Sequence, residues 1–297
     1  MWNARILGYE FYYLLYNFIF YSFFGWIYES CFVSFREKKW VNRGFLNGPI
    51  VPLYGTGATL IYIFLSPMKG QYLSVYLVGA VIATALELVT AFLMEKLFHA
   101  KWWDYSNFKI NYKGRICLAA TAFWGVLALL VIELIQPLMD RLINWIPREI
   151  GEYGGYVILL IFFSDLTVTV LATVKFDQKL AGIQQLRTEL SEYIEGIKLS
   201  DGKEEWRNKL EKHQISELID NMKDRLEKQR ESLDKMAAKG EWDKSVQRFK
   251  ERYSKYSDRT SWIHRRLINA FPNLKSIDRD DALNELKDRL KDRRKKK

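Results

Sequence analysis

Cysteine, histidine and proline are scarce in this sequence, with two, three and six of them among 297 residues. The two cysteines, Cys31 and Cys117, provide no disulfide framework, and the scattered histidines form no zinc-binding pattern. The chain also lacks a phosphate-binding G-x-x-x-x-G-K-[ST] motif and a G-x-S-x-G nucleophile motif. We therefore expect no metal, no cofactor and no catalytic residue of these classes, and we predict that the chain is not an enzyme.

Charge is sparse in the first part of the chain and dense in the second. Residues 1–175 contain 14 Lys and Arg and 11 Asp and Glu, whereas residues 176–297 contain 31 and 24. The net charge of +10 therefore divides into +3 and +7. This contrast excludes a soluble protein with a single core. It predicts a transmembrane helical domain at 1–175 and a charged, coiled-coil-like helical tail at 176–297.

Five stretches of the first domain are apolar over roughly the 20 residues that a bilayer core requires. They show no alternation with a period of two residues, so we expect helices rather than the strands of a barrel. The first stretch lacks a basic flank and a cleavage pattern of small residues, so we expect no secretory signal peptide. The predicted spans are 11–35, 50–67, 72–98, 116–139 and 153–174.

Lysine and arginine in the short loops predict the orientation of these spans. The loops 36–49 and 99–115 are the basic ones, so we place them in the cytoplasm together with the tail. The N-terminus then lies outside, which agrees with an odd number of spans. We predict a multi-pass protein of a bacterial plasma membrane, with the lipid bilayer as its main partner and no nucleic-acid partner.

The charged tail carries apolar residues at intervals of three and four, which is typical of helices that bury a seam against another helix. These seams cover 183–197, 215–236 and 242–267. The second and third seams predict an antiparallel hairpin, and a last helix is expected at about 280–291. The basic end, 293–297, suits either an anionic lipid surface or solvent. We therefore expect the tail to bind a protein partner or to self-associate. The fold class is all-α: a polytopic bundle of five transmembrane helices with a cytoplasmic helical hairpin or coiled-coil tail.

Two acids lie inside the third span. An acid in mid-membrane costs about 2.5–3.5 kcal/mol on insertion scales and normally faces a partner or water. Glu87 and Glu95 share one row of the helix with Gly79, Ala83 and Ala91, whose small side chains let another helix approach closely. This row should turn both acids toward the bundle. There they either serve a function or join helices by hydrogen bonds.

Glu29 lies near the cytoplasmic end of the first span. Arg43, Arg115 and Lys96 are expected at the same depth, so a Glu–Arg pair is predicted there. Such a pair would stabilise the loop or take part in function. Asp165, central in the fifth span, is either a relay group or a hydrogen-bonding link within the bundle.

The loop 43–52 combines two glycines, which permit tight turns, with two prolines, which suit the first turn of a helix. Free backbone N–H groups beside Arg43 would favour an anionic group at the cytoplasmic interface. The alternative is a turn that only begins the second span. With the acids above, this loop predicts one polar cavity in the inner half of the bundle. The candidate substrate-binding residues are Glu29, Arg43, Asn47, Glu87, Glu95, Trp102, Asp104 and Arg115.

Seven segments carry distinctive motifs: GWIYE at 25–29, VNRGFLNGP at 41–49, PLYGTG at 52–57, EKLF at 95–98, WWDYS at 102–106, GRI at 114–116 and RRLINAFPNLKS at 265–276. In these segments the sequence resembles the CmpB-like family of ABC-transporter type IV permeases. The resemblance implies a membrane permease that works with a separate ATP-binding subunit. It implies no particular substrate, reaction or catalytic residue.

Three functions are compatible with these patterns. The first is a permease-like component that moves or binds an unidentified solute or lipid through the polar cavity. The second is a membrane-anchored scaffold or sensor, whose tail recruits partners while the buried acids only hold the bundle together. The third is an intramembrane enzyme that uses Glu87 or Asp165 as a general acid or base.

Overall fold

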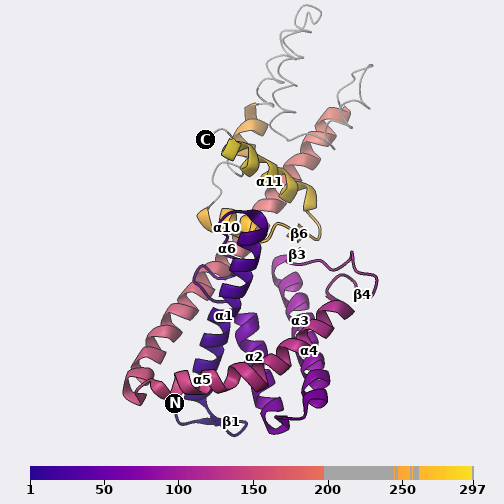
Figure 1. The fold of residues 1–297 in the computed structure, drawn as a ribbon. Coiled ribbons are helices and arrows are strands. Elements are labelled where there is room, and N and C mark those ends of the chain that lie inside the picture. Colours follow the sequence, from indigo (N-terminus) through magenta and orange to yellow (C-terminus); the bar gives the residue numbers. More distant parts are fainter. Residues whose placement is uncertain (197–243, 245–246, 255, 257–260, 296–297) are drawn as a thin grey trace, which may run out of the picture. The chain divides into compact units, whose positions relative to one another are not determined.

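The computed structural model describes residues 1–196, 244, 247–254, 256 and 261–295 (Figure 1). The chain forms two compact units. The first consists of Met1–Thr173 together with Arg266–Lys275. The second consists of the described residues within Val174–Arg265 and Ser276–Lys297.

Helices make up most of the first unit. They are α1 (Phe11–Glu37), α2 (Pro52–Leu65), the 3-10 turn η1 (Ser66–Met68), α3 (Tyr72–Phe98), α4 (Leu118–Leu129), the π-helical segment η2 (Leu130–Ile135), α5 (Gln136–Trp145) and the first part of α6 (Arg148–Gly196). Two short antiparallel ribbons pair β1 (Arg5–Ile6) with β2 (Tyr9–Glu10), and β4 (Asn111–Tyr112) with β5 (Ile116–Cys117). The remaining strands are β3 (Ala100–Lys101) and β6 (Lys275–Ser276).

Four helical stretches in the described residues are long and apolar enough to cross a membrane. They are Phe11–Glu37, Tyr72–Phe98, Leu118–Trp145 and Arg148–Glu192. The second expected span corresponds to α2, which has only 14 residues. At about 1.5 Å per residue, α2 is about 21 Å long, against a hydrocarbon core of about 30 Å. Pro52 begins the helix late and the turn at Ser66 ends it early, so a fifth crossing stays a prediction.

Successive helices of the first unit run back and forth between two ends (Figure 1). The N-terminal end holds the start of the chain and the turns 66–71 and 146–147. The loop end holds the loop 38–51, the connection 99–117 and the segment Arg266–Lys275. The loop end therefore gathers three segments that are far apart in the sequence.

Glycine allows the closest helix contacts. A Cβ atom on Gly55 would lie 2.4 Å from the backbone oxygen of Phe18, and one on Gly79 would lie 2.2 Å from the Cβ of Ala128. These contacts bring α2 against α1, and α3 against α4. The small-residue row of α3 thus faces another helix, as its spacing predicts.

Large apolar side chains are exposed around the first unit. Phe35, Val81 and Leu160 are 89%, 67% and 70% exposed, and α6 presents many more along its length. Exposed apolar surface on this scale is unfavourable in water but suits contact with lipid. Together with the four long apolar helices, it indicates a membrane protein.

The second unit contains the last part of α6, the beginning of α10 (Trp262–Ala270) and α11 (Asp280–Lys295). Its core includes Leu186 and Leu286, and the Arg279 guanidinium donates to Asp177 at 2.5 Å. The fifth span and the first tail seam form one continuous helix, because no proline or glycine pair interrupts the chain between them. The expected hairpin depends on 215–241, which lies outside the described residues.

Candidate functional site

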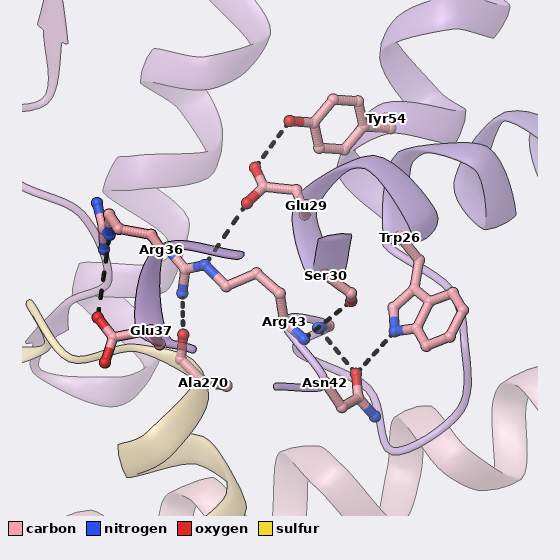
Figure 2. A network of polar contacts seen from close by, with 10 residues as sticks. Trp26, Glu29, Ser30, Arg36, Glu37, Asn42, Arg43, Tyr54 and Ala270 are labelled. Atoms are coloured by element: carbon pink, nitrogen blue, oxygen red, sulfur yellow. Dashed lines mark hydrogen bonds and ion pairs between the residues drawn. The ribbon is translucent and has the colours of Figure 1, made fainter. Parts of the chain in front are cut away.

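The loop that follows α1 folds back onto that helix (Figure 2). The indole N–H of Trp26 donates to Asn42 Oδ1 at 2.8 Å. Ser30 Oγ accepts the backbone N–H of Arg43 at 3.2 Å, and Ser34 Oγ accepts that of Val41 at 2.9 Å. The backbone around Arg43 is therefore fixed by polar side chains on the last turns of α1.

This loop brings Arg43 to Glu29, so the structure contains the expected Glu–Arg pair (Figure 2). Arg43 Nε lies 3.5 Å from Glu29 Oε2, and the Tyr54 hydroxyl donates to Glu29 Oε1 at 2.8 Å. Tyr54 fits beside α1 because position 25 is glycine: a Cβ on Gly25 would lie 2.4 Å from Tyr54 Cγ. Burial lowers the pKa of Arg43, and the neighbouring Glu29 opposes that change.

Glu87 is buried, with 4% of its surface exposed, and both carboxylate oxygens accept hydrogen bonds. The Tyr105 hydroxyl donates at 2.9 Å and the indole N–H of Trp124 at 3.0 Å. The Trp124 ring also lies 6.1 Å from the Tyr54 ring, between centroids, which connects Glu87 to Glu29. Burial, and then the neighbouring Glu87, raises the pKa of Tyr105, so this hydroxyl keeps its proton and remains a donor.

These contacts define a two-glutamate network that consists of Glu29, Arg43, Tyr54, Glu87, Tyr105 and Trp124. It joins four helices and both loops of the loop end. It contains two carboxylates and one guanidinium, and the guanidinium of Arg43 pairs with Glu29. Among the described residues, no Lys or Arg forms an ion pair with Glu87.

Glu95 and Arg115 form a separate ion pair. Arg115 Nε donates to both Glu95 oxygens, at 3.1 and 3.0 Å, and Arg115 Nη2 lies 2.6 Å from Oε2. This bidentate contact raises the pKa of Arg115. The guanidinium also lies over the Phe92 ring. The pair connects α3 to the 99–117 connection, and neither residue contacts the two-glutamate network.

The anionic group predicted for the 43–52 loop belongs to the protein itself. Asp165 on α6 accepts the backbone N–H groups of Asn47 and Gly48 at 3.1 and 2.7 Å. It also accepts the Asn47 side-chain amide at 2.8 Å and the Thr169 hydroxyl at 3.1 Å. The expectation that these N–H groups are free was therefore wrong, because a helix far along the chain supplies their acceptor.

Arg266 is a buried arginine that contacts neutral oxygens. It donates to Asn47 Oδ1 at 3.1 Å, Gly44 O at 2.6 Å and Phe45 O at 2.6 Å. Burial lowers the pKa of Arg266 to about 10, although Asp165 opposes this change. Asn47 therefore bridges Asp165 and Arg266 with the two ends of one amide.

We call the whole of Arg266–Lys275 the docking segment. Its residues after Arg266 also lie against the loop end. Arg43 Nη1 donates to the backbone oxygen of Ala270 at 2.5 Å (Figure 2). Phe271 packs edge-on against Trp102, with ring centroids 4.8 Å apart. Lys275 Nζ lies 2.7 Å from Asp104 Oδ2, and this contact holds the pKa of Asp104 well below its usual range.

The eight predicted binding residues thus fall into distinct groups. Glu29, Arg43 and Glu87 share the two-glutamate network. Glu95 and Arg115 pair with each other, Asn47 binds Asp165 and Arg266, and Trp102 and Asp104 contact the docking segment. Four participants were not among the residues predicted from the sequence: Tyr54, Tyr105, Trp124 and Arg266. Aromatic residues near membrane ends fit interfacial anchoring equally well, so their pattern does not distinguish a partner of a buried acid.

An apolar helical bundle with ion pairs and hydrogen-bonded carboxylates inside it is typical of an integral membrane protein with buried polar sites. A family model described as "Putative ABC-transporter type IV" matches residues 16–170, just over half of the chain, and the chain belongs to this family. The matched region includes the whole two-glutamate network, whereas the docking segment lies beyond it. No curated protein and no solved structure matches the chain.

Proposed function

We propose that this chain is the membrane-embedded, permease-like component of a transporter, and that the two-glutamate network binds its solute or lipid. Glu87 carries the proposal. This carboxylate is 4% exposed, accepts hydrogen bonds only from Tyr105 and Trp124, and has no ion-pair partner among the described residues. An acid kept at such a cost in a membrane helix usually serves a function.

The network offers mixed chemistry for a polar ligand. Glu29 and Glu87 accept hydrogen bonds or attract a cationic group, while Arg43 is suited to an anionic group. The rings of Tyr54 and Trp124, whose polar groups bind Glu29 and Glu87, lie beside each other and supply apolar surface. In this proposal, the network lines a polar cavity in the inner half of the bundle. Of the eight candidate residues, Glu29, Arg43 and Glu87 contact the ligand, and the other five support the loops.

The proposed topology has five crossings in a bacterial plasma membrane, with the N-terminus outside and the tail in the cytoplasm. The short helix α2 provides the second crossing. Both basic loops, 36–49 and 99–115, belong to the loop end, which supports a cytoplasmic position for that end. Because the sequence has no ATP-binding motif of the P-loop type, a separate ATP-binding subunit would supply energy. The chain itself is proposed not to be an enzyme.

Affinity purification from native membranes, followed by lipid and protein mass spectrometry, tests this proposal. Wild type should retain a solute or lipid that both Glu87→Gln and Arg43→Ala lose, with membrane insertion and expression near normal. Glu133→Gln is the matched control, because Glu133 contacts the backbone N–H of Gly70 at the N-terminal end. Loss of both network variants from the membrane would instead assign these residues a purely structural role.

A scaffold or sensor is the second candidate, favoured by the ion pairs that order the tail. In the second unit, Arg252 binds Glu189 at 2.5 Å and Arg279 binds Asp177 at 2.5 Å. A scaffold should keep its function when the acids of the bundle are replaced by neutral residues, but lose it when the tail is truncated. A transporter should lose its function in the first case and keep it in the second. For an intramembrane enzyme, Asp165 is the weaker acid–base candidate, because it already accepts four hydrogen bonds from the protein.

A further inference from the structure

The docking segment contacts both loops of the loop end through three side chains. Arg266 enters the 38–51 loop and donates to the backbone oxygens of Gly44 and Phe45. Phe271 packs against Trp102, and Lys275 binds Asp104. A segment remote in sequence from both loops is thus attached at three points along ten residues.

Arg43 is where this segment meets the two-glutamate network (Figure 2). One part of its guanidinium, Nε, faces Glu29 at 3.5 Å. Another, Nη1, donates to Ala270 O at 2.5 Å, and the guanidinium carbon lies 4.2 Å from the centre of the Phe271 ring. The docking segment therefore covers the cation of the network on the side away from Glu29. An anionic group and the segment would compete for the same N–H groups.

The chemistry of docking suits a reversible contact. Arg266 is 8% exposed, yet its direct hydrogen bonds go to an amide oxygen and two backbone oxygens rather than to a carboxylate. Burying a guanidinium against neutral oxygens is only partly compensated. The hydrogen bonds of Arg266 and the contacts of Phe271 and Lys275 stabilise docking, and the cost of burying the guanidinium offsets part of that stabilisation.

We propose that the docking segment is a self-inhibitory cover: it occupies Arg43 from the loop end and must leave before a solute group can reach the network there. The proposal rests on the proposed function only in taking the network as a ligand site. The covering itself can be measured without any ligand.

The test uses the full-length protein in lipid nanodiscs and two readouts. Hydrogen exchange of peptides covering 266–275 reports whether the segment is docked, and the rate of phenylglyoxal labelling at Arg43 reports access to the network. Arg266→Ala should raise both, with labelling faster by about tenfold, the order expected for losing hydrogen bonds made by a charged group. Arg265→Ala is the matched control, since its exposed side chain adjoins Arg266 and should leave both readouts unchanged.

Phe271→Ala provides a second, milder variant that keeps Arg266 in place and should also raise both readouts. Unchanged labelling of Arg115, which is paired with Glu95 at the same end, shows that the bundle remains folded. Faster exchange of the segment with wild-type labelling of Arg43 would overturn the proposal. Wild-type exchange in both variants would overturn it as well. If the cover behaves as expected but Glu87→Gln still retains the co-purifying ligand, the proposed function fails and the cover stands.

Discussion

The first unit contains two buried polar networks that are built differently. Toward the N-terminal end, Gln136 donates to Asn17, Tyr13 and Asp140 at 3.0, 2.8 and 2.8 Å, and accepts from Tyr21 at 2.9 Å. Tyr13 also donates to Asp140. This Gln136 network connects α1 directly to α5 through side chains of regular helices, and contains no cation.

The two-glutamate network, in contrast, depends on loops. Arg43 and Tyr105 come from connections between helices, and the docking segment completes the surroundings of Arg43. The hydrogen bonds of a network between regular helices can form once and then stay unchanged. A charged network whose partners lie on loops can change when those loops or their contacts move. From this difference we expect the Gln136 network to contribute mainly to stability, and we propose a functional role only for the two-glutamate network.

Replacing Gln136 should have the largest effect on stability. Gln136→Leu leaves Asn17 Oδ1 and the Tyr21 hydroxyl without their partner in a buried region, so we expect unfolding in detergent to become easier by about 3 kcal/mol. Denaturant titration followed by circular dichroism measures this change. The exposed Gln71 offers the control Gln71→Leu, which should change little. Equal stability of the two variants would remove the contrast between the networks.

Asp165→Ala should have the second largest effect and lower the free energy of unfolding in detergent by about 2 kcal/mol. The substitution deprives the backbone N–H groups of Asn47 and Gly48 of their acceptor. The same titration measures it, with the exposed Thr167→Ala as control. Since Asn47 bridges Asp165 and Arg266, hydrogen exchange in 266–275 should also rise. A docking segment that remains fully protected would show that the bridge is unimportant.

Tyr105→Phe should lower the free energy of unfolding by only about 1 kcal/mol. Glu87 loses one hydrogen bond but keeps Trp124 as a donor. Tyr112→Phe, at an exposed tyrosine of β4, is the matched control. The same denaturation assay separates them. If the two-glutamate network is the ligand site, Tyr105→Phe should reduce retention of the co-purifying solute or lipid more than it reduces stability.

The ion pair of Lys275 with Asp104 should have the smallest effect. Because the lysine side chain is 55% exposed, the pair should stabilise docking of the segment by less than about 1 kcal/mol. The pKa of Asp104 is lowered by Lys275, so the pair stabilises docking above the ordinary aspartate pKa of about 3.9 and is lost as pH falls through the lowered value. Lys275→Ala should therefore raise exchange of 266–275 slightly and equally between about pH 5 and 8. Lys109→Ala, at an exposed lysine, should have no effect.

Several features of the site could be predicted from residue type and spacing. The small-residue row through Gly79 and Glu87 indicates a helix that is closely approached, and α4 occupies that position. The depth of Glu29 predicts an ion pair with an arginine, and Arg43 forms that pair. The docking segment coincides with one of the motifs that resemble the family, 265–276, so the sequence singled it out without indicating what it contacts.

Other features depend on tertiary structure that local patterns do not encode. Three cations, Arg43, Arg115 and Lys96, are expected at the depth of Glu29. Only the folded loops show that Arg43 binds Glu29 while Arg115 binds Glu95. The partner of Asp165 is separated from it by more than a hundred residues. The 49-residue helix α6 joins two patterns, an apolar span and a charged seam, that composition separates.

One guanidinium, that of Arg43, touches both a carboxylate inside the bundle and a carbonyl from the distant end of the chain. Thermodynamic reciprocity then applies: whatever factor the segment imposes on the affinity of a ligand for Arg43, the ligand imposes on the segment. A ligand bound at the network would thereby undock the segment and expose it on the aqueous side of the membrane. The same equilibrium would then govern both transport and the recruitment of partners.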